Sequence, residues 1–262
     1  MASNKNQSTR QNWEKFWDDK QQVEDVYDNA ERIVCRLKSN VDLKNKKILE
    51  VGAGTGRDSL MLHEAGATVY VLDYADNSLK IISRLCREKQ LKIHLIQGDA
   101  FKLPIADDSF DIVFHQGLIE HFQDPLPILQ ENFRILKPGG MLLVDVPQRY
   151  HIYTIFKHIL IFLNKWFAGW ETEFTIGQLQ ALTKRVGFEV KQSYGEWMRP
   201  SLFYRLMREL LLQIRIKLPR YPKGPGFLHN WRTRTRQKMT THTLALYTGI
   251  DIGVVGIKKI KT

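Results

Sequence analysis

Cysteine is scarce in this chain of 262 residues, and apolar runs long enough to cross a membrane are missing. The two cysteines, Cys35 and Cys86, stand far apart in helix-like patterns and form no C-x-x-C pair. This favours structural thiols in a reducing cytoplasm over a disulfide framework, a redox centre or a zinc site. The polar first residues predict no secretory signal. The apolar run at 151–168 is too short and too often interrupted by polar side chains for a transmembrane helix.

Acidic residues are rare only in the last quarter of the chain. Residues 199–262 contain 14 Lys and Arg against Glu209 and Asp251, a balance of +12. Because the whole chain carries +11, residues 1–198 are left at about −1. A protein that gripped nucleic acid across its active face would carry positive charge there as well. The distribution therefore argues against nucleic acid as the main partner.

From residue 47 onward, short apolar runs alternate with helix-like patterns. Strands are expected at 48–51, 68–72, 92–96, 110–115, 141–146, 188–194 and 251–259, the fifth of them after a turn at 137–140. Helices are expected at 29–39, 77–89, 125–136 and 175–186. This alternation predicts a doubly wound, mostly parallel sheet with helices on both faces. Two segments interrupt it, after the fifth and the sixth strand, so one domain with two insertions is expected.

The N-terminal segment carries an aromatic stripe. Trp13, Phe16 and Trp17 follow each other at i, i+3 and i+4, which places them on one face of a short helix. Such a helix packs on the body, covers a ligand as a lid, or does both. The predicted organisation is a helical lid at 1–46, a ligand-binding core at 47–147, and cap or acceptor insertions at 147–173 and 195–250.

A glycine-rich turn, GAGTGR, follows the first predicted strand and precedes a helical pattern. Glycines let a ligand approach the backbone, and the helix start offers unpaired N–H groups. A dinucleotide site requires G-x-G-x-x-G. Here Arg57 stands where the third glycine would be, and Glu50 at the strand end would repel a diphosphate. A ligand with an adenosine ribose and a positive charge fits this turn better.

Further polar residues follow the next strands, and ligands bind at the carboxyl ends of such strands. Asp73 is placed to accept both ribose hydroxyls, unless it only caps a helix. Asp99 is placed to accept from an adenine amine, with the same alternative, and Ala100 offers a backbone N–H beside it. Gln116 and Gly117 would face the reacting end of the ligand.

Five motifs together resemble the class I S-adenosylmethionine-dependent methyltransferases, and more narrowly the subgroup called methyltransferase type 11. They are ILEV before GAGTGRD, the acidic Asp73, QGDAFKLPIADDSFDIVF, LIEHF and LKPGGMLLV. The resemblance is close over residues 47–147 and looser to the last strand. It implies a Rossmann-like seven-stranded sheet with the last strand antiparallel, and S-adenosyl-L-methionine as the cofactor. The cofactor-binding residues that it implies are Glu50, Gly52, Ala53, Gly54, Gly56, Asp73, Tyr74, Asp99, Ala100, Gln116 and Gly117.

His121, in the LIEHF motif, is the candidate catalytic residue, as a general base or as a positioning residue. Some relatives bind a metal through Glu-x-x-Glu-His. Here the segment begins with the amide of Gln116 rather than a carboxylate, so no metal site is expected. By position in the first insertion, the candidates for an acceptor pocket are Tyr150, His151, Tyr153, Trp170 and Glu171.

The leading hypothesis is an enzyme that methylates a small-molecule or lipid-like acceptor. The apolar run 151–168 and the basic amphipathic run 202–220 would also allow peripheral contact with an anionic membrane surface, unless both are ordinary packed helices. Two alternatives stay open. One is an RNA or tRNA methyltransferase that uses Trp231 and the basic run 232–238. The other is a regulatory protein that binds S-adenosylmethionine without catalysis.

Overall fold

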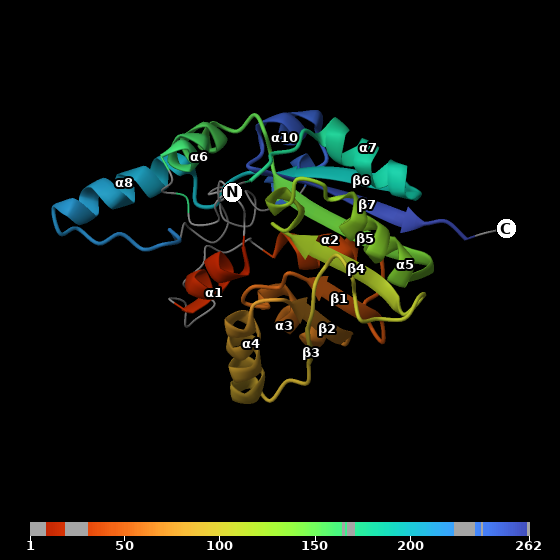
Figure 1. Cartoon of the computed structure of the whole chain (residues 1–262). Coiled ribbons are helices and arrows are strands. Elements are labelled where there is room, and N and C mark those ends of the chain that lie inside the picture. The colour runs from red at the N-terminus through yellow and green to blue at the C-terminus, as the bar shows by residue number, and fades with distance from the viewer. Residues whose placement is uncertain are drawn as a thin grey trace, which may run out of the picture.

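The computed structural model describes residues 9–18, 31–163, 166, 171–222, 234–236 and 238–260. Within them, seven strands form one sheet in the order β3-β2-β1-β4-β5-β7-β6 (Figure 1). β7 runs antiparallel to both of its neighbours, and the other strand pairs are parallel, which confirms the predicted sheet. The strands are β1 (Lys47–Val51), β2 (Thr68–Asp73), β3 (His94–Gln97), β4 (Phe110–Gln116), β5 (Leu136–Pro147), β6 (Phe188–Glu196) and β7 (Asp251–Lys258).

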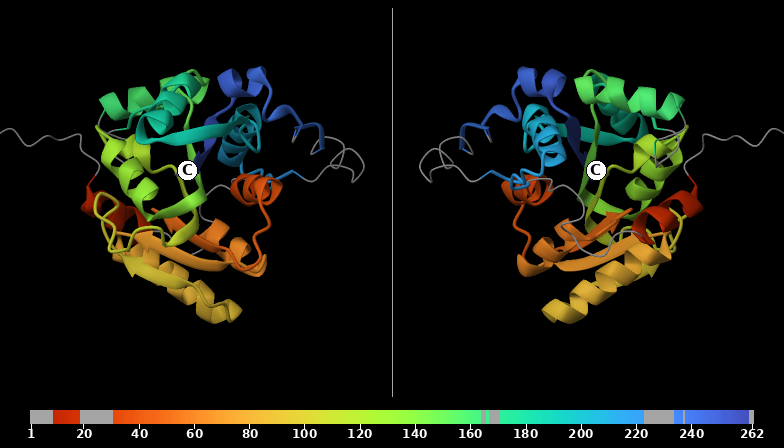
Figure 2. Two further views of the ribbon diagram at one scale, coloured as in Figure 1. Left: turned by 90° about the vertical axis from the view of Figure 1, so that its right-hand side faces the viewer. Right: turned by 90° about the vertical axis from the view of Figure 1, so that its left-hand side faces the viewer.

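Helices cover both faces of the sheet (Figures 1 and 2). On one face α5 (Leu126–Ile135) and α7 (Ile176–Val186) bury Ile128, Leu129 and Leu179 against the apolar side chains of the strands. On the other face α2 (Arg32–Asn40), α3 (Arg57–Glu64) and α4 (Asp76–Lys89) close a second core. Two buried layers on one sheet are what apolar strands alternating with amphipathic helices produce.

Two element boundaries differ from the sequence-based expectation. The predicted turn at 137–140 lies inside β5, because the β4–β5 pairing shifts between Phe110 and Ile112 and the glycine-containing segment bulges out of the ladder. The left-handed φ of Gly139, 78°, allows that excursion. Within the basic amphipathic run 202–220, the helix ends at Gln213, as α8 (Leu202–Gln213), shortly before Arg215 adopts a left-handed φ of 65°.

The two predicted insertions leave the sheet at the same end of the molecule. The first contains α6 (Ile152–Phe162), and the second contains α8 and α10 (Thr243–Thr248) (Figure 1). Across the described ranges, no helix combines the length and the apolar character needed to cross a membrane. Trp170 and Trp231, named above as candidates, and residues 232, 233 and 237 of the basic run lie outside the described residues.

A buried ion cluster holds α2 against the far half of the sheet. Arg32 reaches Asp145 of β5 at 2.6 Å and Asp251 of β7 at 3.0 Å. Burial raises the pKa of Asp251 to about 6, although Arg32 opposes the shift. Tyr194 of β6 donates to the same Asp145 at 2.9 Å, so the cluster joins three neighbouring strands.

Candidate active site

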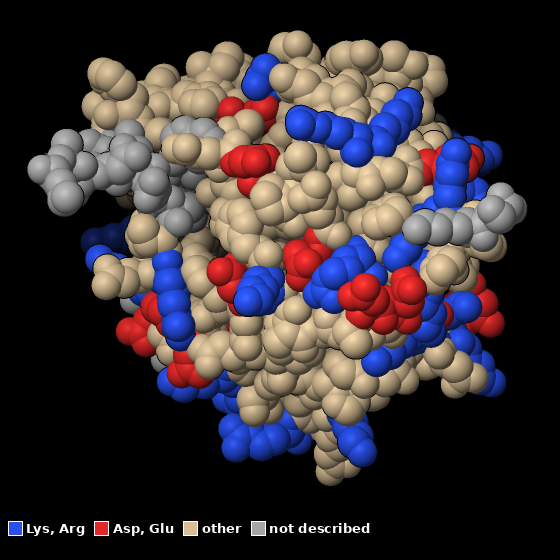
Figure 3. Space-filling view, turned by 45° about the vertical axis from the view of Figure 1, so that its right-hand side comes forward, with Lys and Arg blue, Asp and Glu red and all other residues tan. Residues whose placement is uncertain are grey.

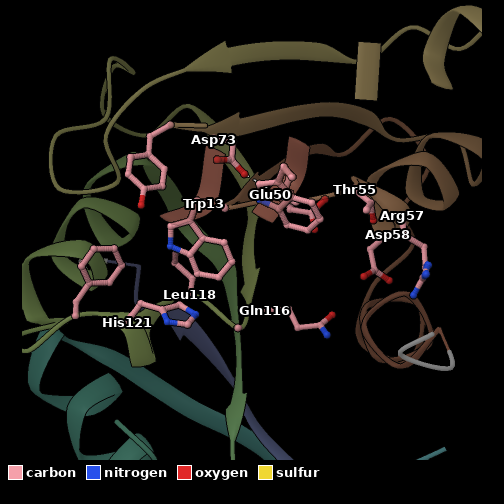
Figure 4. A pocket seen from close by; sticks show the side chains of 16 residues that line it. Trp13, Glu50, Thr55, Arg57, Asp58, Asp73, Gln116, Leu118 and His121 are labelled. Atoms are coloured by element: carbon pink, nitrogen blue, oxygen red, sulfur yellow. Dashed lines mark hydrogen bonds between the residues drawn. The ribbon is translucent and has the colours of Figure 1, made fainter. Parts of the chain in front are cut away.

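A cavity of about 210 Å³ opens at the carboxyl ends of β1, β2 and β4 (Figure 4). Parallel strands place their carboxyl ends at one edge of the sheet, which is where the sequence predicted a ligand. The cavity is lined by Trp13, Trp17, Glu50, Gly52, Ala53, Gly54, Thr55, Arg57, Asp58, Asp73, Tyr74, Gln116, Gly117, Leu118, His121 and Phe122. Eight of the eleven residues predicted to bind the cofactor are therefore brought together, along with His121.

Three predicted residues do not line this cavity. Gly56 is the N-cap of α3 and faces the core, where an added Cβ would lie 2.9 Å from Ile82. Asp99 accepts a hydrogen bond from the backbone of Phe101, whose ring meets Phe122 of the cavity wall edge-on at 5.0 Å. Asp99 and the adjacent Ala100 thus lie beside the rim.

The glycine turn is held by the carboxylate of the next strand. The backbone N–H of Gly54 donates to Asp73 Oδ2 at 3.1 Å, and the hydroxyl of Ser78 donates to the same oxygen at 3.0 Å. Ala75 N–H donates to the other oxygen at 2.9 Å. Gly54 has a φ of 56°, and an added Cβ would lie 2.7 Å from the ring of Trp17. Only glycine fits there, because the backbone conformation and the tight space both exclude a side chain.

Negative charge dominates the floor of the cavity. Glu50 is only 5% exposed, and Ser59 donates to it at 2.5 Å. Burial, and next the charge of Asp58, raise the pKa of Glu50 well above its usual range. Burial also raises the pKa of Asp73, against the hydrogen bonds from Ala75, Gly54 and Ser78. Glu50, Asp58 and Asp73 line the cavity with one cationic side chain, that of Arg57. A positively charged ligand would stabilise the charged forms of these carboxyl groups.

S-adenosylmethionine fits these residues. Asp73 lines the cavity, and its carboxylate accepts only hydrogen bonds, so it suits a ribose hydroxyl as donor. The buried carboxyl groups of Glu50 and Asp58 line the cavity, where the ammonium and sulfonium groups of the ligand would favour their charged forms. The exposed backbone at Gly52 and Gly54 leaves room for the ligand to lie against the turn.

The helix α1 (Arg10–Asp18) lies over the cavity and supplies residues that the core motifs do not include. Trp13 and Trp17 stack with ring centroids 6.5 Å apart, and both line the cavity. Glu14 fastens the helix, because its carboxylate accepts from the backbone of Asp76 at 2.8 Å and of Asn77 at 3.1 Å, at the start of α4. The predicted segment 1–46 thus divides: α1 overlies the cavity, whereas α2 packs in the second core.

His121 sits between the cavity and a buried charged cluster. Its ring meets Trp13 edge-on at 4.8 Å, as Figure 4 shows, and its Nδ1 lies 3.8 Å from Glu171 Oε1. Glu171 is held in turn by Lys157 at 2.7 Å and by the indole N–H of Trp166 at 2.7 Å. Burial would lower the pKa of Lys157, but Glu171 and Glu173 outweigh it and raise that pKa. The Nδ1 side of the His121 ring therefore faces the carboxylate of Glu171, and the ring also lines the cavity.

The residues predicted for an acceptor pocket are less tightly grouped. Tyr150 is 63% exposed and does not line the cavity. Tyr153 packs near Trp166 with ring centroids 6.5 Å apart, and His151 caps α6 by accepting from the Tyr153 N–H at 3.1 Å. Glu171 is the member of the group that reaches the site, through His121.

Sequence reasoning missed several lining residues, among them Thr55, Asp58, Leu118 and Phe122. Each stands inside the motif GAGTGRD or LIEHF, so its place in a motif at a strand end was the available signal. The described part of the chain contains no group of three or more His, Cys, Asp or Glu side chains that could hold a metal ion.

Comparison with known proteins gives a consistent picture. Residues 49–144 match the family model described as methyltransferase domain. A demethylmenaquinone methyltransferase from Geobacillus sp. (strain WCH70) is 33% identical over 138 residues, which are 48% of this chain and 58% of the relative. The chain thus spans little more than half the length of that curated relative.

Solved structures share the fold over nearly the whole chain. A putative methyltransferase of Haloferax volcanii, in complex with the activator Trm112, has a TM-score of 0.66 at 18% identity and covers 97% of this chain and 99% of its own. A putative sarcosine dimethylglycine methyltransferase from Galdieria sulphuraria has a TM-score of 0.61 at 20% identity, over 87% of this chain and 84% of its own.

Proposed function

We propose that this chain, whose residues 49–144 are a class I S-adenosylmethionine-dependent methyltransferase domain of the type 11 kind, is an enzyme that methylates a small-molecule or lipid-like acceptor. The observation that carries the proposal is a single cavity in which the glycine turn and the buried Glu50 and Asp73 meet His121. The name of the Geobacillus relative, a demethylmenaquinone methyltransferase, supports a lipid-like acceptor. The two cysteines are free thiols, as a cytoplasmic enzyme would have.

When bound, S-adenosylmethionine supplies a methyl group that is already activated on a positively charged sulfur. The protein then contributes alignment, which is worth about 7–11 kcal/mol when two reacting groups are held in line. Asp73 anchors the ribose, and the carboxylates of Glu50 and Asp58 hold the charged end of the ligand. Trp13 and Trp17 exclude water from above.

His121 is proposed as the general base for an acceptor that arrives protonated. The side chain is nearly buried, and Glu171 near its Nδ1 would stabilise the imidazolium formed by proton uptake. Lys157 and Trp166 fix the position of Glu171, so the carboxylate stands beside the imidazole before an acceptor binds. A base so placed typically contributes about 10²–10⁴-fold in rate.

The RNA alternative gains no support from the described residues. Within the basic run 232–238, Arg236 is engaged in an ion pair with Glu196 at 2.5 Å, as part of the fold. The acceptor is therefore sought among small molecules and lipids.

The test of the donor site is binding of S-adenosylmethionine by titration calorimetry to the wild type and to Asp73→Ala. Losing the charged hydrogen-bond acceptor should weaken affinity about 10- to 100-fold. The exposed Asp42→Ala is the control, and Asp73→Asn, which keeps one of the two acceptor oxygens, is the second variant if the alanine variant folds poorly. Unchanged affinity in both Asp73 variants would show that the ribose is not bound there.

Turnover is then measured as transfer of labelled methyl into phenols, amines and lipid extracts. His121→Gln should lower kcat while leaving donor affinity unchanged, and should remove the acidic limb of the pH–rate profile. If kcat falls but the acidic limb of the pH–rate profile is retained, His121 positions the acceptor and does not act as the base. Tight donor binding without turnover on any acceptor class would favour the regulatory alternative.

A further inference from the structure

The helix α6 has its polar and apolar faces reversed relative to a surface helix. Its apolar side chains point outward: Ile152, Ile155, Phe156 and Ile159 are exposed, and Phe162 is 85% exposed. Its single Lys, in contrast, is buried. A soluble helix ordinarily buries its apolar stripe and exposes its charges.

The reversal is fixed by contacts on the inner face. Lys157 is 2% exposed and bonds to Glu171 at 2.7 Å and to Glu173 at 2.8 Å. One turn earlier, Thr154 donates to the backbone oxygen of Gln148 at 2.9 Å. Rotating α6 to bury its apolar side would separate Lys157 from Glu171 and Glu173. Breaking a buried ion pair in this way is strongly destabilising. The apolar side of α6 is therefore held outward.

The helix α8 presents a second apolar stripe at the same end of the molecule. None of its residues is buried, and Phe203, Leu206 and Leu210 are exposed at i, i+3 and i+7, with Phe203 76% exposed. Figures 1 and 2 show α8 projecting from the body on the side that carries α6. Exposed apolar patches on this scale mark interaction sites.

Positive charge accompanies this apolar surface. Residues 199–222 contain six Arg and Lys against the single acid Glu209, a balance of +5. On the face shown in Figure 3, by contrast, basic and acidic side chains lie interspersed. Apolar side chains flanked by Arg and Lys are the composition of helices that lie in the interface of anionic membranes.

We propose that α6 and α8 form a docking face for the surface of a lipid bilayer that contains anionic lipids. The helices have 11 and 12 residues and are each roughly 17 Å long, so they would lie in the interface rather than cross a hydrocarbon core of about 30 Å. A second copy of the chain is a less favourable partner for this face. In a symmetric dimer, residues 199–222 of the two copies, each with a balance of +5, would face and repel each other. Docking is independent of the proposed methyl transfer, since it requires neither donor nor acceptor.

The test is co-sedimentation of the full chain with vesicles of phosphatidylcholine alone, or mixed with an equal amount of phosphatidylglycerol. The chain should bind the mixed vesicles more tightly, and added salt should weaken that binding. Phe162→Ser with Phe203→Ser should weaken it at least about tenfold. Arg215→Gln with Lys217→Gln should weaken it about fivefold per cation removed. All four side chains are exposed, so folding should be preserved.

The matched controls lie away from the docking face. Leu95→Ser with Ile260→Ser removes two exposed apolar side chains, and Lys44→Gln with Lys92→Gln removes two exposed cations. Both should bind as the wild type does. Equal binding to neutral and mixed vesicles, or equal losses in control and docking-face variants, would overturn the proposal. So would a dimer in sedimentation velocity that Phe162→Ser with Phe203→Ser dissolves while vesicle binding is absent. S-adenosylmethionine affinity, measured on the same samples, separates this failure from failure of the proposed enzyme.

Discussion

Replacing Lys157 with Met would test whether the buried charged cluster holds α6 in place. Lys157 neutralises two carboxylates at 2.7 and 2.8 Å, and all three side chains are at most 6% exposed. One such contact is worth about 6 kcal/mol at an effective dielectric constant of 20, before desolvation is subtracted. Methionine keeps the volume but leaves Glu171 buried without its lysine, and leaves Glu173 with His158, whose Nε2 lies 2.6 Å from its carboxylate.

The expected loss in the free energy of unfolding is about 3–5 kcal/mol, the range found when one partner of a buried ion pair is removed. For a domain of this size that corresponds to a fall in Tm of roughly 10 °C. Urea denaturation followed by tryptophan fluorescence, together with calorimetry, measures both quantities. Hydrogen exchange in residues 152–162 shows whether the loss is local to α6.

Two variants control this experiment. Lys157→Met combined with Glu171→Gln and Glu173→Gln should recover most of the loss, because replacing a whole buried ion set costs far less than breaking it. Lys80→Met removes an equally short but exposed contact with Asp76 and should have a much smaller effect. A loss below about 1 kcal/mol in Lys157→Met, or no recovery in the triple variant, would refute the electrostatic account of α6.

Two further predictions concern the donor site. Glu50→Gln should stabilise the ligand-free protein at neutral pH and weaken S-adenosylmethionine binding. Because burial and Asp58 raise the folded-state pKa of Glu50, its contribution to stability is present at acidic pH and is lost as the pH rises above about 4.5. The Tm advantage of the variant should therefore grow with pH in a calorimetric series, and a constant difference would contradict the assignment. Glu14→Ala should loosen α1 and speed donor release about two- to fivefold in stopped-flow fluorescence, as loss of a helix cap implies. Glu88→Ala on α4 is the exposed control, and equal release rates in all three proteins would show that α1 does not retain the donor.

Much of the core was predictable because it depends on local patterns. Short apolar runs and their spacing predicted the strands, and parallel strands bring their ends to one edge of the sheet. Glu50 and Asp73 therefore had to lie near the glycine turn, and both line the cavity. Gly56 shows the limit of such reasoning, because its place in a motif does not reveal that it faces Ile82 in the core.

The insertions were less predictable, because their structure depends on contacts between distant residues. The sequence showed that 151–168 is unusually apolar, but not that Lys157 points inward. That orientation is decided by Glu171 and Glu173, more than a dozen residues later. Likewise nothing local to Arg32 signals that it lies between Asp145 and Asp251.

The position of β7 has a consequence for the order in which the protein is assembled. β7 pairs with β5 on one side and β6 on the other, through residues 251–258. While the chain is being synthesised, β5 and β6 are complete long before the strand that joins them. Each therefore presents an open edge to other nascent chains during that interval. The donor-binding half, β1 to β4, lies on the far side of β5 and can pair without β7. The strands that carry the donor site would thus pair early, and β7 would complete the sheet last.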